Sequence, residues 1–257
     1  MRRPIIAGNW KMNKTPSETI KLISELKPLV AGANAQVVVC PTSVCLFAAK
    51  GAAEGSNIAI GAQNVFFEDA GAYTGEISCD SLLELGVEFV IIGHSERRQY
   101  FAETDETVNK KVLKALQKGL KPIICVGEHL KEKEHGITNE IVRMQTKLAL
   151  EGVLANDIEN IVIAYEPVWA IGTGLTATSQ EANNTIREIR KAVGELYGEK
   201  ACLLYTSAKE ILGNNVKIKI DGGVKTLEKA QELICAGADR IGLTATVKIA
   251  QEALGAK

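Results

Sequence analysis

The sequence lacks the residue patterns that mark several classes of protein. It contains six cysteines without a Cys-x-x-Cys pair and only three histidines, so we expect no metal site. Lys and Arg number 30 against 31 Asp and Glu, and this balance does not suit a protein that binds nucleic-acid backbones. No apolar run approaches the roughly 18 residues of a membrane-spanning helix. We therefore expect neither nucleic acid nor membrane as a partner.

The beginning of the sequence carries no targeting pattern. Met1 to Pro4 are basic, and no apolar segment of signal-peptide length follows them. We expect a cytoplasmic protein whose cysteines stay reduced. With 46% hydrophobic and 24% charged residues the composition is that of a globular protein, and barrels of about this length often form one domain.

Short apolar runs rich in β-formers recur along the chain. The stretches between them carry helix-start signals, namely Pro16, Thr104 and Thr178, each beside early carboxylates. The eight runs are Ile5–Trp10, Gln36–Cys40, Ile58–Gln63, Phe89–Ile92, Pro122–Val126, Ile161–Tyr165, Val216–Ile220 and Asp239–Leu243.

Eightfold alternation of strand and helix predicts an α/β protein, a (β/α)₈ barrel that forms a single domain over residues 1–257. The alternative is an open doubly wound sheet, but no Gly-x-Gly-x-x-Gly turn follows the first strand, which disfavours a dinucleotide-binding version. Residues 201–207 could form a ninth strand. Because a barrel has no place for it, we interpret this stretch as a connector or a helix extension.

Polar residues end several of the predicted strands, at the end of the barrel where active sites lie. Asn9 and Lys11 follow the first strand, His94 and Glu96 the fourth, and Glu166 the sixth. A single Lys there is usually only solvated, and a single His is more often structural. Glu166 lies beside Pro and Trp in a partly apolar setting that suits a general base. Together these side chains predict an active site at one mouth of the barrel.

Two loops stand out. Residues 170–177, directly after the candidate base, contain two glycines near an apolar tip and predict a closing lid that excludes water; the alternative is an ordinary surface loop. The stretch from Gln63 to Ser78 is too long for an ordinary strand-to-helix connection. It contains two Phe and one Tyr, which indicate a buried destination rather than a disordered loop.

Three long motifs resemble those of the triosephosphate isomerase family, and the resemblance covers residues 1 to about 200. The motifs are Gly8–Asn13 (GNWKMN), Ile92–Arg98 (IGHSERR) and Ala164–Gly174 (AYEPVWAIGTG). The resemblance implies a TIM barrel that interconverts dihydroxyacetone phosphate and D-glyceraldehyde 3-phosphate through an enediol. It implies no cofactor, and a place in glycolysis and gluconeogenesis.

The same resemblance implies roles for individual residues. Glu166 would be the base, and His94 would polarise the substrate carbonyl oxygens as a neutral imidazole. Lys11 would stabilise negative charge, and Asn9 would help to hold the substrate oxygens. Glu96 would be a supporting residue of the site.

Substrate binding and assembly are implied as well. The backbone amide of Gly172 would meet the substrate phosphate. The loop from Gln63 to Ser78 would dock into a second copy of the chain with a Thr at its tip, so the resemblance implies a homodimer.

After about residue 200 the resemblance changes. The family pattern Tyr-Gly-Gly-Ser after strand seven and Val-Gly-Gly-Ala-Ser after strand eight is absent. Residues 214–250 resemble deoxyribose-phosphate aldolase instead, with Gly222, Gly223 and Gly242 on its phosphate-binding glycines and Lys219 on a lysine of its pattern. Tyr205 stands where that family has its Schiff-base lysine. These features suggest a chimera with a junction near residues 200–214; the alternative is a diverged natural isomerase.

Three hypotheses follow from the two resemblances. The first is an isomerase impaired by a replaced phosphate-binding tail. The second is an engineered or recombined barrel with little or no activity, and the third is a class I aldolase. Under the first, we expect Gly222, Gly223 and Gly242 to bind the substrate phosphate through backbone amides. Lys219 is either paired with Asp221 inside the barrel or an extra cation near the phosphate.

Overall fold

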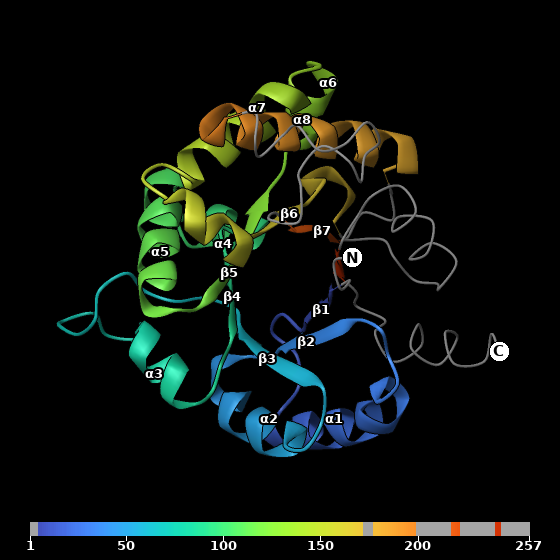
Figure 1. The fold of residues 1–257 in the computed structure, drawn as a ribbon, viewed down its shortest axis with the longest axis vertical. Coiled ribbons are helices and arrows are strands. Elements are labelled where there is room, and N and C mark those ends of the chain that lie inside the picture. The colour runs from blue at the N-terminus through green and yellow to red at the C-terminus, as the bar shows by residue number, and fades with distance from the viewer. Residues whose placement is uncertain (1–4, 172–176, 199–216, 222–239, 243–257) are drawn as a thin grey trace.

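Eight parallel strands close into a barrel in the order of the sequence, and the described helices lie on its outside (Figure 1). The computed structural model describes residues 5–171, 177–198, 217–221 and 240–242. The strands are β1 Ile5–Asn9, β2 Gln36–Cys40, β3 Ile58–Ala62, β4 Phe89–Ile92, β5 Lys121–Val126, β6 Val162–Tyr165, β7 Lys217–Asp221 and β8 Arg240–Gly242. The α-helices are α1 Pro16–Val30, α2 Leu46–Ala53, α3 Cys79–Glu84, α4 Ser95–Tyr100, α5 Asp105–Lys118, α6 Leu130–Glu134, α7 Thr138–Ala149 and α8 Ser179–Tyr197. Short 3₁₀ turns are η1 Ser43–Cys45, η2 Ala155–Asn160 and η3 Val168–Ala170.

The predicted (β/α)₈ barrel is confirmed, and each predicted strand begins and ends at or next to the observed residue. The alternative of an open sheet is wrong, because β1 pairs with β8 through Ile5 opposite Arg240 and Ala7 opposite Gly242. Residues 201–207, interpreted as a connector, lie outside the described part of the chain.

The predicted helix starts are confirmed where the structure describes them. Thr104 and Thr178 are N-caps whose hydroxyls accept backbone N–H groups, and Pro16 is the first residue of α1. At Thr178 the carboxylate of Glu181 also accepts the Thr178 backbone N–H at 2.8 Å. Such caps satisfy amides that have no partner inside the helix, which is why the signal is readable in sequence.

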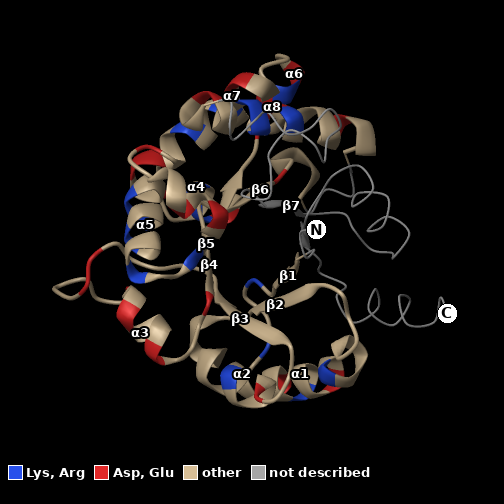
Figure 2. Cartoon of the chain, viewed as in Figure 1, with Lys and Arg blue, Asp and Glu red and all other residues tan. Residues whose placement is uncertain are grey.

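The core divides into two layers, as the alternation of side chains along a strand requires. One layer lies between the sheet and the helices. Among the described residues, many of the charged ones lie on these helices (Figure 2). The other fills the barrel interior with alternate strand residues: Ile5, Ala7, Val38, Cys40, Ala59, Phe89, Ile91, Ile123, Cys125, Val162 and Ala164. Asn9 and Glu166 continue this alternation by two residues beyond Ala7 and Ala164. The polar side chains therefore begin where the apolar interior ends.

Candidate active site

His94 and Glu166 meet at the end of the barrel. His94 follows β4 as the N-cap of α4, and Glu166 follows β6. The His94 Nε2 and Glu166 Oε1 atoms lie 3.2 Å apart, and both residues are buried. The Ser95 backbone N–H donates to Glu166 Oε2 at 3.1 Å, while Oε1 accepts no hydrogen bond from the described residues. One carboxylate oxygen is thus held by the Ser95 N–H, and the other is buried without a hydrogen-bond partner among the described residues.

The hydrogen bond at the other ring nitrogen of His94 determines its tautomer. The Glu96 backbone N–H donates to His94 Nδ1 at 3.2 Å, so Nδ1 acts as an acceptor and the ring proton lies on Nε2. A neutral imidazole with its N–H on Nε2 can donate to a substrate oxygen. The arrangement has the geometry expected of a neutral polarising histidine.

Lys11 approaches from β1 in a constrained backbone conformation. Its φ angle is +52°, which is uncommon for a residue with a side chain, and its backbone N–H donates to Asn9 Oδ1 at 2.9 Å. The Lys11 Nζ atom contacts Glu96 Oε1 at 2.6 Å. The structure therefore joins Asn9, Lys11, His94, Glu96 and Glu166 into one connected group.

The strained turn at Lys11 is held by Gln63, which the sequence placed at the end of the third predicted strand and the start of the long loop but not at the site. The Gln63 side-chain amide donates to the Lys11 carbonyl at 2.9 Å and to the Cys40 carbonyl at 2.8 Å. A backbone outlier persists only where its surroundings hold it in place. No sequence pattern signals this contact, because the two partners are 52 positions apart.

A buried ion cluster supports the turn before His94, and the sequence analysis missed it. Gly93 has a φ of +74°, and its N–H donates to Glu103 at 3.2 Å. Glu103 also accepts from Arg97 Nε at 2.7 Å and contacts Lys111 Nζ at 3.2 Å. Burial lowers the pKa of Lys111, and the Glu103 carboxylate acts against that shift. Glu103 is thus a buried charge with two cationic partners, as burial of a charge requires.

A second missed carboxylate, Glu128, anchors the segment that contains Glu166. Its Oε1 atom accepts from the Tyr165 hydroxyl at 3.0 Å and from the Trp169 indole N–H at 2.8 Å. Burial raises the pKa of Glu128, while the hydrogen bond from Trp169 opposes the rise. Lys133 Nζ lies 3.3 Å from the centroid of the Trp169 ring. The two ends of the Tyr165–Trp169 segment are therefore anchored to one buried carboxylate.

A hollow of about 450 Å³ lies beside the group of Asn9, Lys11, His94 and Glu96. Asn9, Lys11, His94 and Glu96 line it, together with residues of the long loop after β3. In the described part of the chain no cluster of three or more His, Cys, Asp or Glu side chains could hold a metal ion. Among the described residues, no helix is both long and apolar enough to span a membrane.

Most of the predicted phosphate-binding residues lie in parts of the chain that the structure does not describe. Gly172, Gly222 and Gly223 lie outside the described residues, as does most of the predicted lid at residues 170–177. Gly242 ends β8, with Ala7 and Asp221 as its strand partners. Side chains of β7, including that of Lys219, are also outside the described part.

Comparison with known proteins identifies the family. The model of the family "Triosephosphate isomerase" matches residues 4–233. The chain belongs to the triosephosphate isomerase family. A protein of that name from Caldanaerobacter subterraneus subsp. tengcongensis is 61% identical over 199 residues, 77% of this chain and 80% of the relative. The namesakes from Thermoanaerobacter pseudethanolicus and Clostridium perfringens are 56% and 51% identical, each over 91% of this chain and 90% of its own length.

The family match also bears on the predicted chimera. It continues to residue 233 and so crosses the junction predicted at residues 200–214. The comparisons give no support to an aldolase-like tail, which stays an interpretation of the sequence. Triosephosphate isomerase family membership is thus shown for the barrel that carries the site.

Proposed function

We propose that this chain is a triosephosphate isomerase that interconverts dihydroxyacetone phosphate and D-glyceraldehyde 3-phosphate. The observation that carries the proposal is the distance of 3.2 Å between Glu166 Oε1 and His94 Nε2, beside Lys11, in a chain of this family. Glu166 Oε1 accepts no hydrogen bond from the described residues. A class I aldolase and an inactive barrel have no comparable support in the geometry.

Glu166 acts as the base in the proposed reaction. Its Oε1 atom takes a proton from the carbon next to the substrate carbonyl, and the C–H electron pair forms the double bond of an enediol. The carbonyl oxygen gains a proton and the hydroxyl oxygen on the neighbouring carbon later loses one, a shift that the Nε2–H of His94 can carry. The Glu166 carboxyl group, whose proton can exchange with solvent, then protonates the former carbonyl carbon, which converts ketose to aldose. The two sugars have the same formula, so the reaction requires no oxidant, reductant or cofactor. A buried carboxylate held through its other oxygen by Ser95 is well placed for this transfer.

His94, Lys11 and Asn9 act on the substrate oxygens. The Nε2–H of neutral His94 donates to an oxygen as negative charge develops there, and the ammonium of Lys11 stabilises the same charge. Asn9 helps to hold the oxygens and also fixes the Lys11 backbone through its own side chain. Glu96 serves as a supporting residue, because it pairs with Lys11 and its backbone N–H sets the His94 tautomer.

The remaining parts of the proposal rest on the sequence. Gly172, Gly222, Gly223 and Gly242 bind the phosphate through backbone amides, which glycine allows an anion to approach closely. Residues 1–257 form a single domain, supported by strands from Ile5 to Gly242 that close one barrel. The protein is cytoplasmic, where charged sugar phosphates are retained because they do not cross membranes unaided.

A coupled assay tests the isomerase proposal. The purified chain, given dihydroxyacetone phosphate, is expected to form glyceraldehyde 3-phosphate, while Glu166→Gln prepared from the same host reports contamination. A second measurement in D₂O follows deuterium incorporation into the substrate by NMR, which detects proton abstraction even when turnover is slow. A folded chain that gives neither product nor exchange above the Glu166→Gln background would contradict the proposal.

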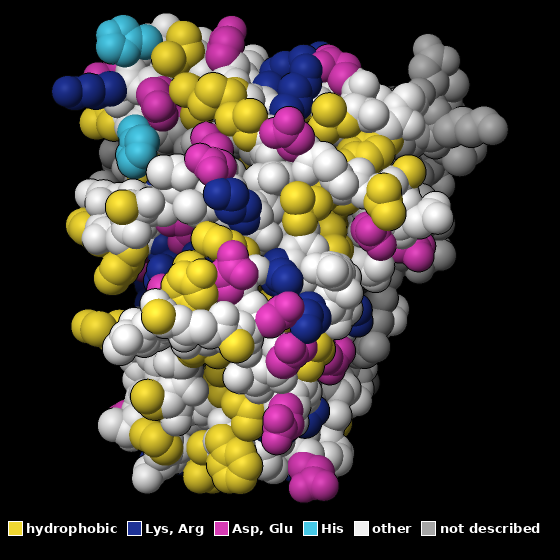
Figure 3. Space-filling model, turned by 90° about the vertical axis from the view of Figure 1, so that its left-hand side faces the viewer, with side chains coloured by type: hydrophobic (Ala, Val, Ile, Leu, Met, Phe, Trp, Pro, Cys, Tyr) yellow, Lys and Arg dark blue, Asp and Glu magenta, His cyan; other side chains and the backbone are white. Residues whose placement is uncertain are grey.

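We also propose a homodimer formed through the loop from Gln63 to Ser78, with Thr74 at its tip. The loop extends beyond the barrel between β3 and α3 (Figure 1). Phe66 stacks on Phe67 with ring centroids 4.2 Å apart and contacts Tyr73 at 4.7 Å, so the loop has its own aromatic support. Hydrophobic side chains lie among the charged ones on the face that carries it (Figure 3).

Exposed apolar residues suit such an interface. Met12 is 93% exposed, Phe47 79% and Phe101 64%, which is unusual for large apolar side chains. Met12 and Phe101 also line the 450 Å³ hollow beside the site, which is a suitable receptor for the loop of a second copy. A docked loop would cover these side chains.

Light scattering tests the dimer. At micromolar concentration we expect twice the chain mass of 27.6 kDa. Thr74→Asp is expected to give a monomer, because the interface would have to bury an unpaired charge. A wild-type chain of single mass would contradict the proposal, and so would an unaltered dimer in Thr74→Asp with its circular dichroism spectrum preserved.

A further inference from the structure

The backbone of Glu166 lies directly against Gly127, the residue that follows β5. A Cβ atom built on Gly127 would overlap the Glu166 carbonyl oxygen and lie 2.7 Å from its carbonyl carbon. The Glu166 N–H donates to the Val126 carbonyl at 2.8 Å, and the Val168 N–H donates to the Glu128 carbonyl at 3.1 Å. The position of Glu166 therefore depends on where residues 126–128 lie.

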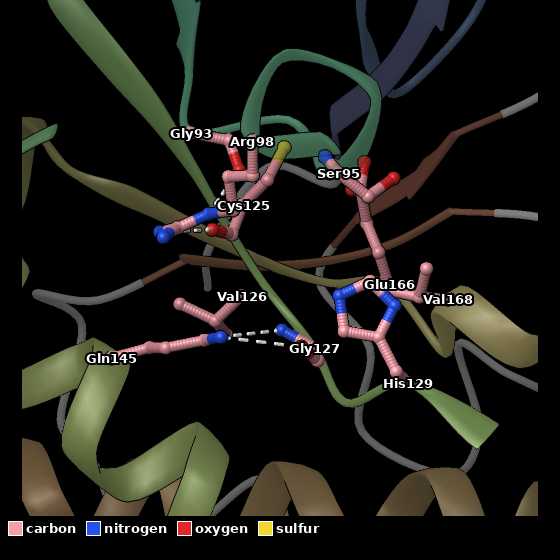
Figure 4. Close-up of a pocket in the computed structure, with 10 residues that line it drawn as sticks. All are labelled: Gly93, Ser95, Arg98, Cys125, Val126, Gly127, His129, Gln145, Glu166 and Val168. Carbon is pink, nitrogen blue, oxygen red and sulfur yellow. Dashed lines mark hydrogen bonds between the residues drawn. The ribbon is translucent and has the colours of Figure 1, made fainter. Parts of the chain in front are cut away.

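Gln145 of α7 binds both polar backbone groups of Gly127. The Gly127 N–H donates to Gln145 Oε1 at 2.8 Å, and Gln145 Nε2 donates to the Gly127 carbonyl at 3.3 Å (Figure 4). The strand pairing of β5 with β6 ends at Val126 opposite Tyr165, so Gly127 lies beyond the ladder. At Gly127 the side-chain amide of Gln145 therefore forms the hydrogen bonds that a neighbouring strand would otherwise form with the backbone.

A cavity of about 20 Å³ borders Gln145, Gly127 and Glu166, with Ser95 and Arg98 on its other walls (Figure 4). Close packing resists the displacement of a backbone segment, and this segment has fewer packing neighbours on the side of the cavity. The two hydrogen bonds between Gln145 and Gly127 oppose a displacement of the segment.

We propose that Gln145 is a positioning residue for the base: by fixing Gly127 it fixes the backbone, and with it the carboxylate, of Glu166. The proposal rests on the isomerase function given above. Gln145 does not act on the substrate directly. It acts through its two hydrogen bonds with Gly127. The competing explanation is that Gln145 only fastens α7 to the barrel, although Val142, Thr146 and Ala149 already bury one face of that helix.

The kinetic test is Gln145→Met, which keeps the length of the side chain but removes both the donor and the acceptor. We expect kcat to fall about tenfold or more with KM changed by less than about twofold, because the base is misplaced while the substrate still binds. Gln180→Met is the matched control, since Gln180 on α8 is exposed and bonds Asn184. Gln145→Glu keeps the acceptor for the Gly127 N–H and should recover part of the rate.

Amide hydrogen exchange gives a readout that does not depend on activity. In Gln145→Met we expect the Glu166 amide to lose about tenfold or more of its protection, while amides of β2 and β4 keep theirs. An unchanged kcat with an unchanged Glu166 amide would overturn the proposal. An equal loss of protection across the whole barrel would also overturn it, because Gln145 would then only stabilise the fold. If the wild-type chain showed no isomerisation, the proposed function would fail, whereas the exchange pattern would still decide the positioning role.

Discussion

Replacement of Glu166 by Gln is expected to lower kcat for isomerisation by about 10³-fold or more, because an amide cannot accept the substrate proton. The fold should survive, since the Gln side chain has nearly the same shape and its oxygen can still accept the Ser95 N–H. KM should change far less than kcat. The measurement is steady-state kinetics with the coupled assay, beside thermal unfolding of both proteins.

A second substitution separates loss of the base from its displacement. Glu166→Asp keeps a carboxylate but withdraws it by one methylene, and a displacement of about 1 Å is expected to reduce the rate about 100-fold. The order of activity should therefore be wild type, then Asp, then Gln. Substantial turnover by Glu166→Gln, in a preparation free of host isomerase, would remove Glu166 as the base.

Gly127→Ala is expected to lower kcat by about 100-fold, because the new methyl group would overlap the Glu166 carbonyl oxygen and move the base. Both partners are backbone, so no flexible side chain can give way. Overpacking of this kind typically costs about 1–3 kcal/mol in the free energy of unfolding. Kinetics and urea unfolding of the same sample measure the two effects.

Gly51→Ala is the matched control for that substitution. Gly51 lies within α2, and a Cβ built there meets nothing within 4 Å. Alanine in a helix interior is favoured over glycine by about 0.5–1 kcal/mol, so this variant should be slightly more stable and fully active. If Gly127→Ala behaved like Gly51→Ala, the close approach of Gly127 to Glu166 would not constrain the base.

Most strands and helix starts of the barrel can be predicted from the sequence because the patterns that mark them are local. Most strands are short runs of β-branched and apolar residues, and the observed boundaries lie at or next to the predicted ones. Helix starts at Thr104 and Thr178 depend on hydroxyl caps within one turn. A cap joins residues that are only a few positions apart, so its presence can be inferred from the sequence without knowledge of the tertiary structure.

The choice between a closed barrel and an open sheet was not a local matter. It depends on the pairing of Ile5 with Arg240, which no pattern within one strand announces. Glu103 and Glu128 were missed for a similar reason. Each looks like an ordinary surface carboxylate in sequence, and only burial against distant donors reveals its structural role.

The sequence by itself determined the strand–helix alternation and the residue types at the strand ends, among them Asn9, Lys11, His94 and Glu166. Tertiary structure decided how those groups are aimed. Ser95 meets Glu166 across 71 positions, and Lys11 meets Glu96 across 85. Gln145 reaches Gly127 from a helix outside the barrel. Such contacts arise because closure brings the carboxyl ends of all the strands to one mouth, whereas the spacing along the chain carries no record of which side chains will meet there.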